Sequence, residues 1–120
     1  MTTARKGLLT AALATAATAS LIGAGPAAAT KNCSPGTYPG DGYFTKLTVT
    51  GISCSGGRAV EKGHYRCRIK HGKRGKCPSF SGWRCSEFRP ASGNIPTEYN
   101  ARVTCKKGSR KVVYTYQQNT

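Results

Sequence analysis

Histidine and glutamate side chains are the groups in this sequence best suited to acid–base chemistry. His64 follows Glu61 by three residues, so the two side chains would share one face of a helix. Exported basic ribonucleases combine such groups with lysine or arginine, which hold the phosphate. Structural roles explain the same residues: Glu61 as a partner of nearby cations, and His71 as a solvated loop residue. We keep a secreted ribonuclease or toxin as an alternative and assign no catalytic residue.

Cysteine is the second chemically capable residue type. An even number of cysteines in a short chain with an export signal predicts three disulfides. No two cysteines have the two-residue spacing of zinc ribbons, so we expect no metal site and no other cofactor. The six residues are Cys33, Cys54, Cys67, Cys77, Cys85 and Cys105.

The positions of these cysteines favour one pairing among several. Cys67 and Cys77 flank a nine-residue loop rich in glycine and charge, which a local bridge would close. Cys85 and Cys105 lie in strand-like segments that could be neighbours. This leaves Cys33 paired with Cys54. A swap that pairs Cys54 with Cys85 or Cys105 stays open, because six cysteines permit 15 pairings.

Positive charge is the strongest compositional signal. The formal net charge is +15, and it falls to +13 when residues 1–29, with Arg5 and Lys6, are removed. Such a field attracts polyanions, and outside a cell these are teichoic acid, acidic polysaccharide and, without sequence specificity, nucleic acid. High charge also serves solubility and favours a monomer. The residues predicted to bind polyanions are Arg66, Arg68, Lys70, Lys73, Arg74, Lys76, Lys106, Lys107, Arg110 and Lys111.

These cations form two clusters. One lies within residues 58–76 and the other surrounds the turn at residues 107–110. Closure of the 67–77 loop would fix the first cluster in advance and lower the ordering entropy lost on binding. We therefore expect the loop to contribute more to binding than the turn.

A protease inhibitor is the other alternative function. A basic loop between Cys67 and Cys77, or the Arg89–Pro90 connection, would suit a trypsin-like pocket. The gaps between successive cysteines match no Kazal, Kunitz or Bowman–Birk pattern.

Residues 1–29 have the layout of a secretory signal peptide. A short positive start at Arg5 and Lys6 precedes an uncharged apolar run, and Ala27–Ala28–Ala29 offers the small residues that a signal peptidase recognises. We expect an extracellular protein that begins near Thr30 and has no transmembrane segment after cleavage.

The elements that would position these residues can be outlined from periodicity. Residues 30–42 have the proline and glycine content of an N-terminal arm. Residues 43–50 alternate like a strand, with Tyr43, Thr45, Leu47 and Val49 on one face. Residues 58–69 have a weak helical period, with Val60, His64 and Cys67 along one stripe and Ser53 or Ser55 as the cap. Residues 83–88 form a second strand, and residues 99–106 and 111–117 form a hairpin.

The predicted fold is a small, disulfide-rich α+β domain with one helix on a three- to four-stranded antiparallel sheet. The expected organisation is a signal peptide at 1–29, an arm at 30–42 and a cationic domain at 43–120.

The cysteine contexts also carry a resemblance to a known group. The stretches Ile52-Ser53-Cys54, Tyr65-Arg66-Cys67, Gly82-Trp83-Arg84-Cys85 and Arg102-Val103-Thr104-Cys105 resemble those of small secreted proteins of actinobacteria. The resemblance covers about 65 residues, from Ile52 to Gln117. It implies an exported, disulfide-bonded α+β domain and brings no catalytic residues with it.

Overall fold

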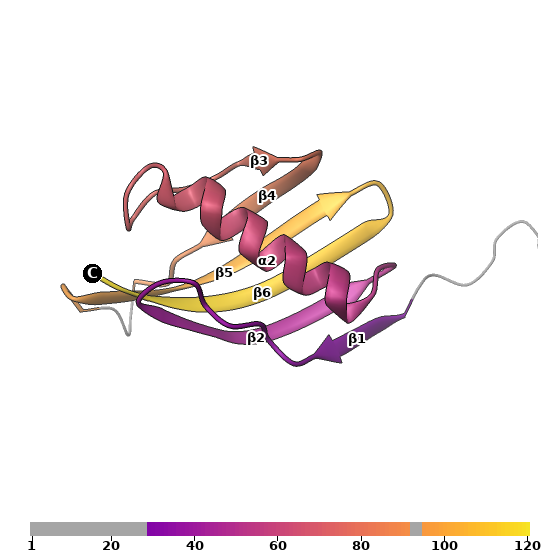
Figure 1. Cartoon of the computed structure of the whole chain (residues 1–120), viewed down its shortest axis with the longest axis horizontal. Coiled ribbons are helices and arrows are strands. Elements are labelled where there is room, and N and C mark those ends of the chain that lie inside the picture. Colours follow the sequence, from indigo (N-terminus) through magenta and orange to yellow (C-terminus); the bar gives the residue numbers. More distant parts are fainter. Residues whose placement is uncertain (1–28, 92–94) are drawn as a thin grey trace, which may run out of the picture.

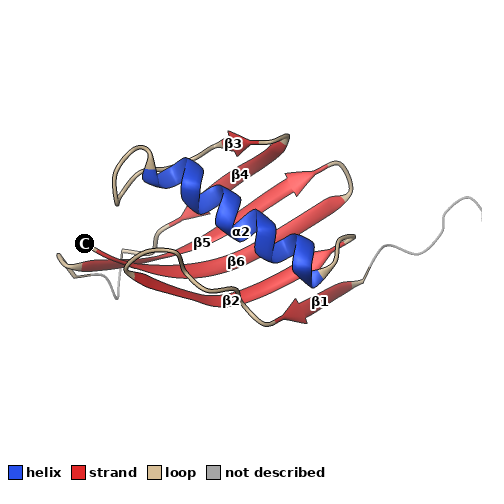
Figure 2. Cartoon of the chain, viewed as in Figure 1, coloured by secondary structure: helices blue, strands red, loops and turns tan. Residues whose placement is uncertain are grey.

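The computed structural model describes residues 29–91 and 95–120, so all but the last residue of the predicted signal peptide lie outside it. One helix lies across one face of an antiparallel sheet (Figures 1 and 2). The strands follow the order β1-β2-β6-β5-β4-β3. The elements are β1 Thr30–Cys33, β2 Gly42–Thr50, α2 Cys54–Ile69, β3 Ser79–Phe80, β4 Trp83–Phe88, β5 Glu98–Lys107 and β6 Arg110–Asn119.

The α+β class is confirmed, but the prediction of three to four strands is wrong, because the sheet has six. Two short edge strands account for the difference. β1 lies in the stretch whose proline and glycine content suggested an arm. β3 is only two residues long, and it pairs with β4 through a tight turn in which Ser81 and Gly82 have positive φ angles of 47° and 83°.

The predicted faces of β2 are correct for Leu47 and Val49 but wrong at the start of the strand. The register shifts between Phe44 and Lys46, so that one extra residue, Thr45, bulges out of the pairing with β6. This bulge places Phe44 on the same buried face as Leu47 and Val49. Tyr43, which strict alternation assigns to that face, is 60 % exposed.

Helix α2 begins at Cys54, four residues before the predicted start. Ser53 caps it, since its Oγ accepts a hydrogen bond from Gly56 N at 3.0 Å. Gly57 lies so close to the sheet that a Cβ there would stand 2.4 Å from Val49 Cγ1. The helix therefore keeps a residue of low helical propensity because its lack of a side chain allows close packing.

The core lies between α2 and the sheet. The helix contributes Val60 and His64, as the periodicity predicts, and the sheet contributes the inward residues of β2, β5 and β6. The segment between β1 and β2 closes one side, where the Tyr38 ring makes edge contacts with Phe44 and Tyr65. The predicted arm is therefore part of the packed domain.

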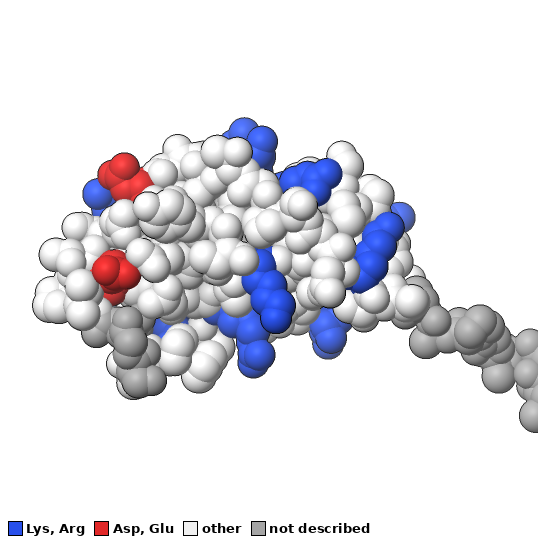
Figure 3. Space-filling model, turned by 90° about the horizontal axis from the view of Figure 1, so that it is seen from below, with Lys and Arg blue, Asp and Glu red and all other residues white. Residues whose placement is uncertain are grey.

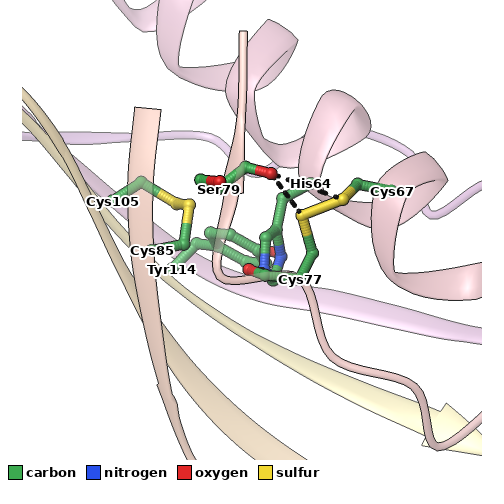
Figure 4. The surroundings of a disulfide bond; sticks show 7 residues. All are labelled: His64, Cys67, Cys77, Ser79, Cys85, Cys105 and Tyr114. Carbon is green, nitrogen blue, oxygen red and sulfur yellow. Dashed lines mark hydrogen bonds between the residues drawn. A yellow bond between two sulfur atoms is a disulfide. The ribbon is translucent and has the colours of Figure 1, made fainter. Parts of the chain in front are cut away.

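The three disulfides pair as preferred from the sequence. Cys33–Cys54 joins β1 to the start of α2, and Cys67–Cys77 joins the end of the helix to the segment before β3. Cys85–Cys105 links β4 to β5 across the sheet (Figure 4). In the part of the chain that the structure describes, no helix is long and apolar enough to cross a membrane.

Candidate functional site

His64 lies in the core and not at a surface. It is 0 % exposed, and its Nε2 lies 3.2 Å from the carbonyl oxygen of Cys77 (Figure 4). Because a carbonyl only accepts, Nε2 carries the proton, and Nδ1 accepts a hydrogen bond from the Tyr114 hydroxyl. Burial lowers the His64 pKa to about 4. His64 is thus a neutral residue that joins the helix to β6 and to the segment before β3.

Glu61 is also fully buried and faces the 34–41 segment. Its Oε1 accepts a hydrogen bond from Gly36 N at 3.1 Å, while Oε2 has no partner among the described residues. Burial raises the Glu61 pKa to about 7. The pair considered for acid–base chemistry therefore shares a helix face, as predicted, but that face is turned into the core.

Arg68 corrects the predicted set of polyanion-binding residues. It is 1 % exposed, so it cannot reach a polymer. Its guanidinium donates to the Tyr99 hydroxyl at 2.9 Å and to Gln118 Oε1 at 3.3 Å, and lies 4.2 Å from the centroid of the Tyr116 ring. The helical period that places Val60 and His64 inside also places Arg68 inside. Tyrosine hydroxyls accept the hydrogen bonds that water would accept from an exposed guanidinium.

Arg89, a candidate for an inhibitory loop, is likewise engaged. It pairs with Glu87, donates to the carbonyl oxygens of Arg74 and Gly75 at 2.9 Å, and its side chain is 18 % exposed. These bonds tie the 71–76 loop to the end of β4. A side chain held in this way is not available to enter a protease pocket.

The cations of the 67–77 loop differ in their contacts with the rest of the protein. Lys73 lies 4.0 Å from Asp41, and Arg74 donates to the Pro96 carbonyl at 3.1 Å while it covers the Tyr99 ring. Lys70 and Lys76 are exposed. The structure therefore weakens the reason for expecting the loop to dominate binding, because two of its cations serve the fold.

The face of the sheet opposite α2 gathers cations from four strands. In β5, Tyr99, Ala101, Val103 and Cys105 point inward, so Arg102 and Lys106 point outward. The same alternation in β2, β4 and β6 points further cations away from the core. We call this surface the open face; its exposed cations are Lys46, Arg84, Arg102, Lys106 and Lys111.

The strand register arranges these cations in two rows. Lys111, Lys106 and Arg84 lie directly opposite one another on β6, β5 and β4. Lys46 and Arg102 both pair with Thr115, and a hollow of about 170 Å³ lies between them. The two rows are four residues apart along β5, or about 13 Å.

Neither ion pair among the described residues includes an open-face cation. The Glu98 side chain also points outward from β5, but it lies at the start of that strand, before Arg102. Figure 3, seen from below the view of Figure 1 and so toward an edge of the sheet, shows lysine and arginine side chains over the middle and right of that side and acidic side chains at its left end. Because the open-face cations take part in neither ion pair, their positive charge is not neutralised by neighbouring carboxylates.

The open face includes two of the residues predicted to bind polyanions and three residues that were not predicted to do so. Lys106 and Lys111 belong to both, whereas Lys46, Arg84 and Arg102 were not in the set. Arg66, Lys70 and Arg110 are exposed around a groove on the helix side, and Lys107 donates to the Ser81 carbonyl at 3.1 Å. Alternation could have placed the missed residues of β4 and β5 on an outward face, because Arg84, Ser86 and Phe88, like Arg102, Thr104 and Lys106, occupy every second position. It could not have placed them beside one another.

Metal ligands do not gather in the described residues: no group of three or more His, Cys, Asp or Glu side chains lies close enough to hold an ion. The cysteines are all paired. The open face is thus the candidate site, and its chemistry is ionic. The likeness to small secreted actinobacterial proteins stays a prediction, because no family model, no curated protein and no solved structure matches the chain.

Proposed function

We propose that the protein is secreted and binds extracellular polyanions on the open face of its sheet. The row formed by Lys111, Lys106 and Arg84 is the observation that carries the proposal. Like charges directly opposite one another on neighbouring strands destabilise a sheet. A row of three cations therefore lowers the stability of the free protein. A bound polyanion would relieve this repulsion, and the relief would strengthen binding.

The surrounding surface supports a linear polymer as the ligand. The hydroxyls of Thr48 and Thr104 lie between the cationic rows, that of Thr115 lies within the second row, and all three could donate to phosphate, sulfate or carboxylate groups. The cations are spread over several strands of a sheet surface and do not surround one common point. Teichoic acid, acidic polysaccharide and nucleic acid are all linear polyanions of this kind, and nucleic acid would be bound without sequence preference.

Two triple variants test the proposal. Arg84→Gln/Lys106→Gln/Lys111→Gln removes the row, and Arg66→Gln/Lys70→Gln/Lys76→Gln removes one arginine and two lysines elsewhere. We expect the row variant to elute from heparin at clearly lower salt than the control variant. Its log-log dependence of affinity on salt should also be shallower, since fewer counterions are released.

Equal losses in the two variants would mean that the whole surface attracts polyanions and that no site exists. Passage of the unaltered protein through heparin at low salt would reject polyanion binding altogether. A ribonuclease assay on the same samples separates binding from turnover, because only an enzyme degrades the polymer.

A further inference from the structure

A groove runs along the helix side of the molecule, away from the open face. It has a volume of about 540 Å³ and lies between α2 and the β3–β4 hairpin. Ile52, Ala59, Phe80 and Trp83 form its apolar surface. A cavity of a few hundred cubic ångströms with apolar walls is in the range that holds small ligands.

Small helix residues create this groove. Gly56, Ala59 and Gly63 follow one another at helical spacing on the side of α2 that faces the hairpin. The Phe80 ring packs over Gly63, where a Cβ would lie 2.5 Å from the ring. The hairpin therefore stands beside the helix while the space along Ala59 stays open.

The ends of the groove are positively charged. Arg66 and Lys70 are four residues apart at the C-terminal end of α2, so they lie on the same side of the helix. Arg110, at the start of β6, lies near Gly51 and marks the other end. No aspartate or glutamate is among the described residues that line it.

We propose that this groove binds a single-chain anionic amphiphile, with its aliphatic chain along the floor and its headgroup between Arg66 and Lys70. On the helix, the small residues from Gly56 to Gly63 extend the groove by about 10 Å along the helix axis, and Ile52 lies just before the helix. An apolar floor fits an aliphatic chain, and two cations at one end fit a phosphate or carboxylate. A polar polymer would leave this floor unused, so the site is separate from the open face and does not rest on the proposed function.

Trp83 supplies a direct readout. It is the only tryptophan in the chain and it lines the groove. Dodecyl phosphate, kept below its micelle concentration, should change the Trp83 fluorescence saturably, and calorimetry should give one molecule per chain. Butyl phosphate has the headgroup without the chain, and dodecyl maltoside has the chain without the charge. We expect both to bind at least about tenfold more weakly.

Two matched pairs of substitutions locate the headgroup. Arg66→Gln/Lys70→Gln should weaken dodecyl phosphate binding about tenfold or more. Lys46→Gln/Arg102→Gln also removes one arginine and one lysine, but from the open face, and should leave this binding unchanged. Ala59→Phe fills the groove at an exposed helix position and should abolish binding while the protein keeps its unfolding temperature.

Several outcomes would overturn the proposal. These are equal binding of dodecyl maltoside, equal losses in the two double variants, undiminished binding to Ala59→Phe, or no heat and no fluorescence change with dodecyl phosphate. Heparin affinity measured on the same proteins keeps the two proposals apart, because loss of one activity leaves the other standing.

Discussion

A single guanidinium organises the polar part of the core. Arg68 lies among the hydroxyls of Tyr38 and Tyr99, the amide of Gln118 and the ring of Tyr116. Each of these groups has left water and depends on the others for its hydrogen bonds. In a domain of this size, such a network fixes which face of the helix turns inward.

Arg68→Gln should therefore destabilise the fold. The Tyr38 and Tyr99 hydroxyls keep their own acceptors, but each loses a charged donor, and such a hydrogen bond contributes about 1.5–3 kcal/mol. Arg66→Gln, two residues away on the exposed side, removes the same charge and should change the stability by about 0.5 kcal/mol or less. Denaturant titration of both variants measures the difference. Equal stabilities would contradict the structural role of Arg68.

Glu61 and His64 have opposite effects on pH-dependent stability. The Glu61 pKa is raised to about 7, so its favourable contribution is complete below its ordinary pKa and is lost as the pH rises through 7. The His64 pKa is lowered to about 4, so its contribution is present above its ordinary pKa and is lost as the pH falls through 4. Between about pH 4.5 and 6.5 the two trends oppose each other.

Glu61→Gln removes one of these trends and keeps an oxygen for Gly36 N. The unfolding free energy of this variant should rise with pH between about 4 and 6.5 more steeply than that of the unaltered protein. The neighbouring charges, Arg58 and Lys62 beside Glu61 and Glu87 beside His64, are present in both proteins. Parallel stability curves for the two proteins would show that Glu61 does not titrate in this range.

At the scale of elements, the central hairpin and its neighbours carry the charge. Arg84→Gln/Lys106→Gln/Lys111→Gln removes two directly opposed like-charged pairs, worth about 0.2–1 kcal/mol each. We expect this variant to unfold at a higher temperature than the unaltered protein at low salt, by a few degrees, while it binds polyanions less well. The difference should shrink in high salt, because screening weakens the repulsion. A lower unfolding temperature at low salt would mean that the row stabilises the sheet.

Elements with strong local signals could be predicted, and those that depend on distant contacts could not. The β5–β6 hairpin has alternating residues around Gly108, and its position is confirmed. The bulge at Thr45 has no local sequence signal, because it depends on the packing of Phe44 against Tyr38 and Tyr114 in the core. β1 and β3 form only because neighbouring strands offer free edges.

At the scale of the whole molecule, a disulfide pairing could be preferred without knowledge of the fold, whereas the candidate site could not be located without it. The disulfide pairing preferred from loop length and strand position, with a swap of Cys54 left open, is the one that the structure shows. The candidate site did not follow from clusters in the sequence, because Lys46, Arg84 and Arg102 come together only through the strand order. That order separates a charged sheet face from a grooved helix face, which permits two binding activities in one small domain.

Both edges of the sheet are short, and each has a proline beside it. β1 has four residues and Pro35 follows it; β3 has two residues and Pro78 precedes it. A long bare edge presents unpaired N–H and C=O groups that recruit strands from other copies and start aggregation, and prolines and short strands prevent this. A protein that collects along a polymer reaches a high local concentration, at which such recruitment is hardest to avoid. If the proposed polyanion binding holds, the short edges would allow many copies to lie close together on one polymer chain without pairing their sheets.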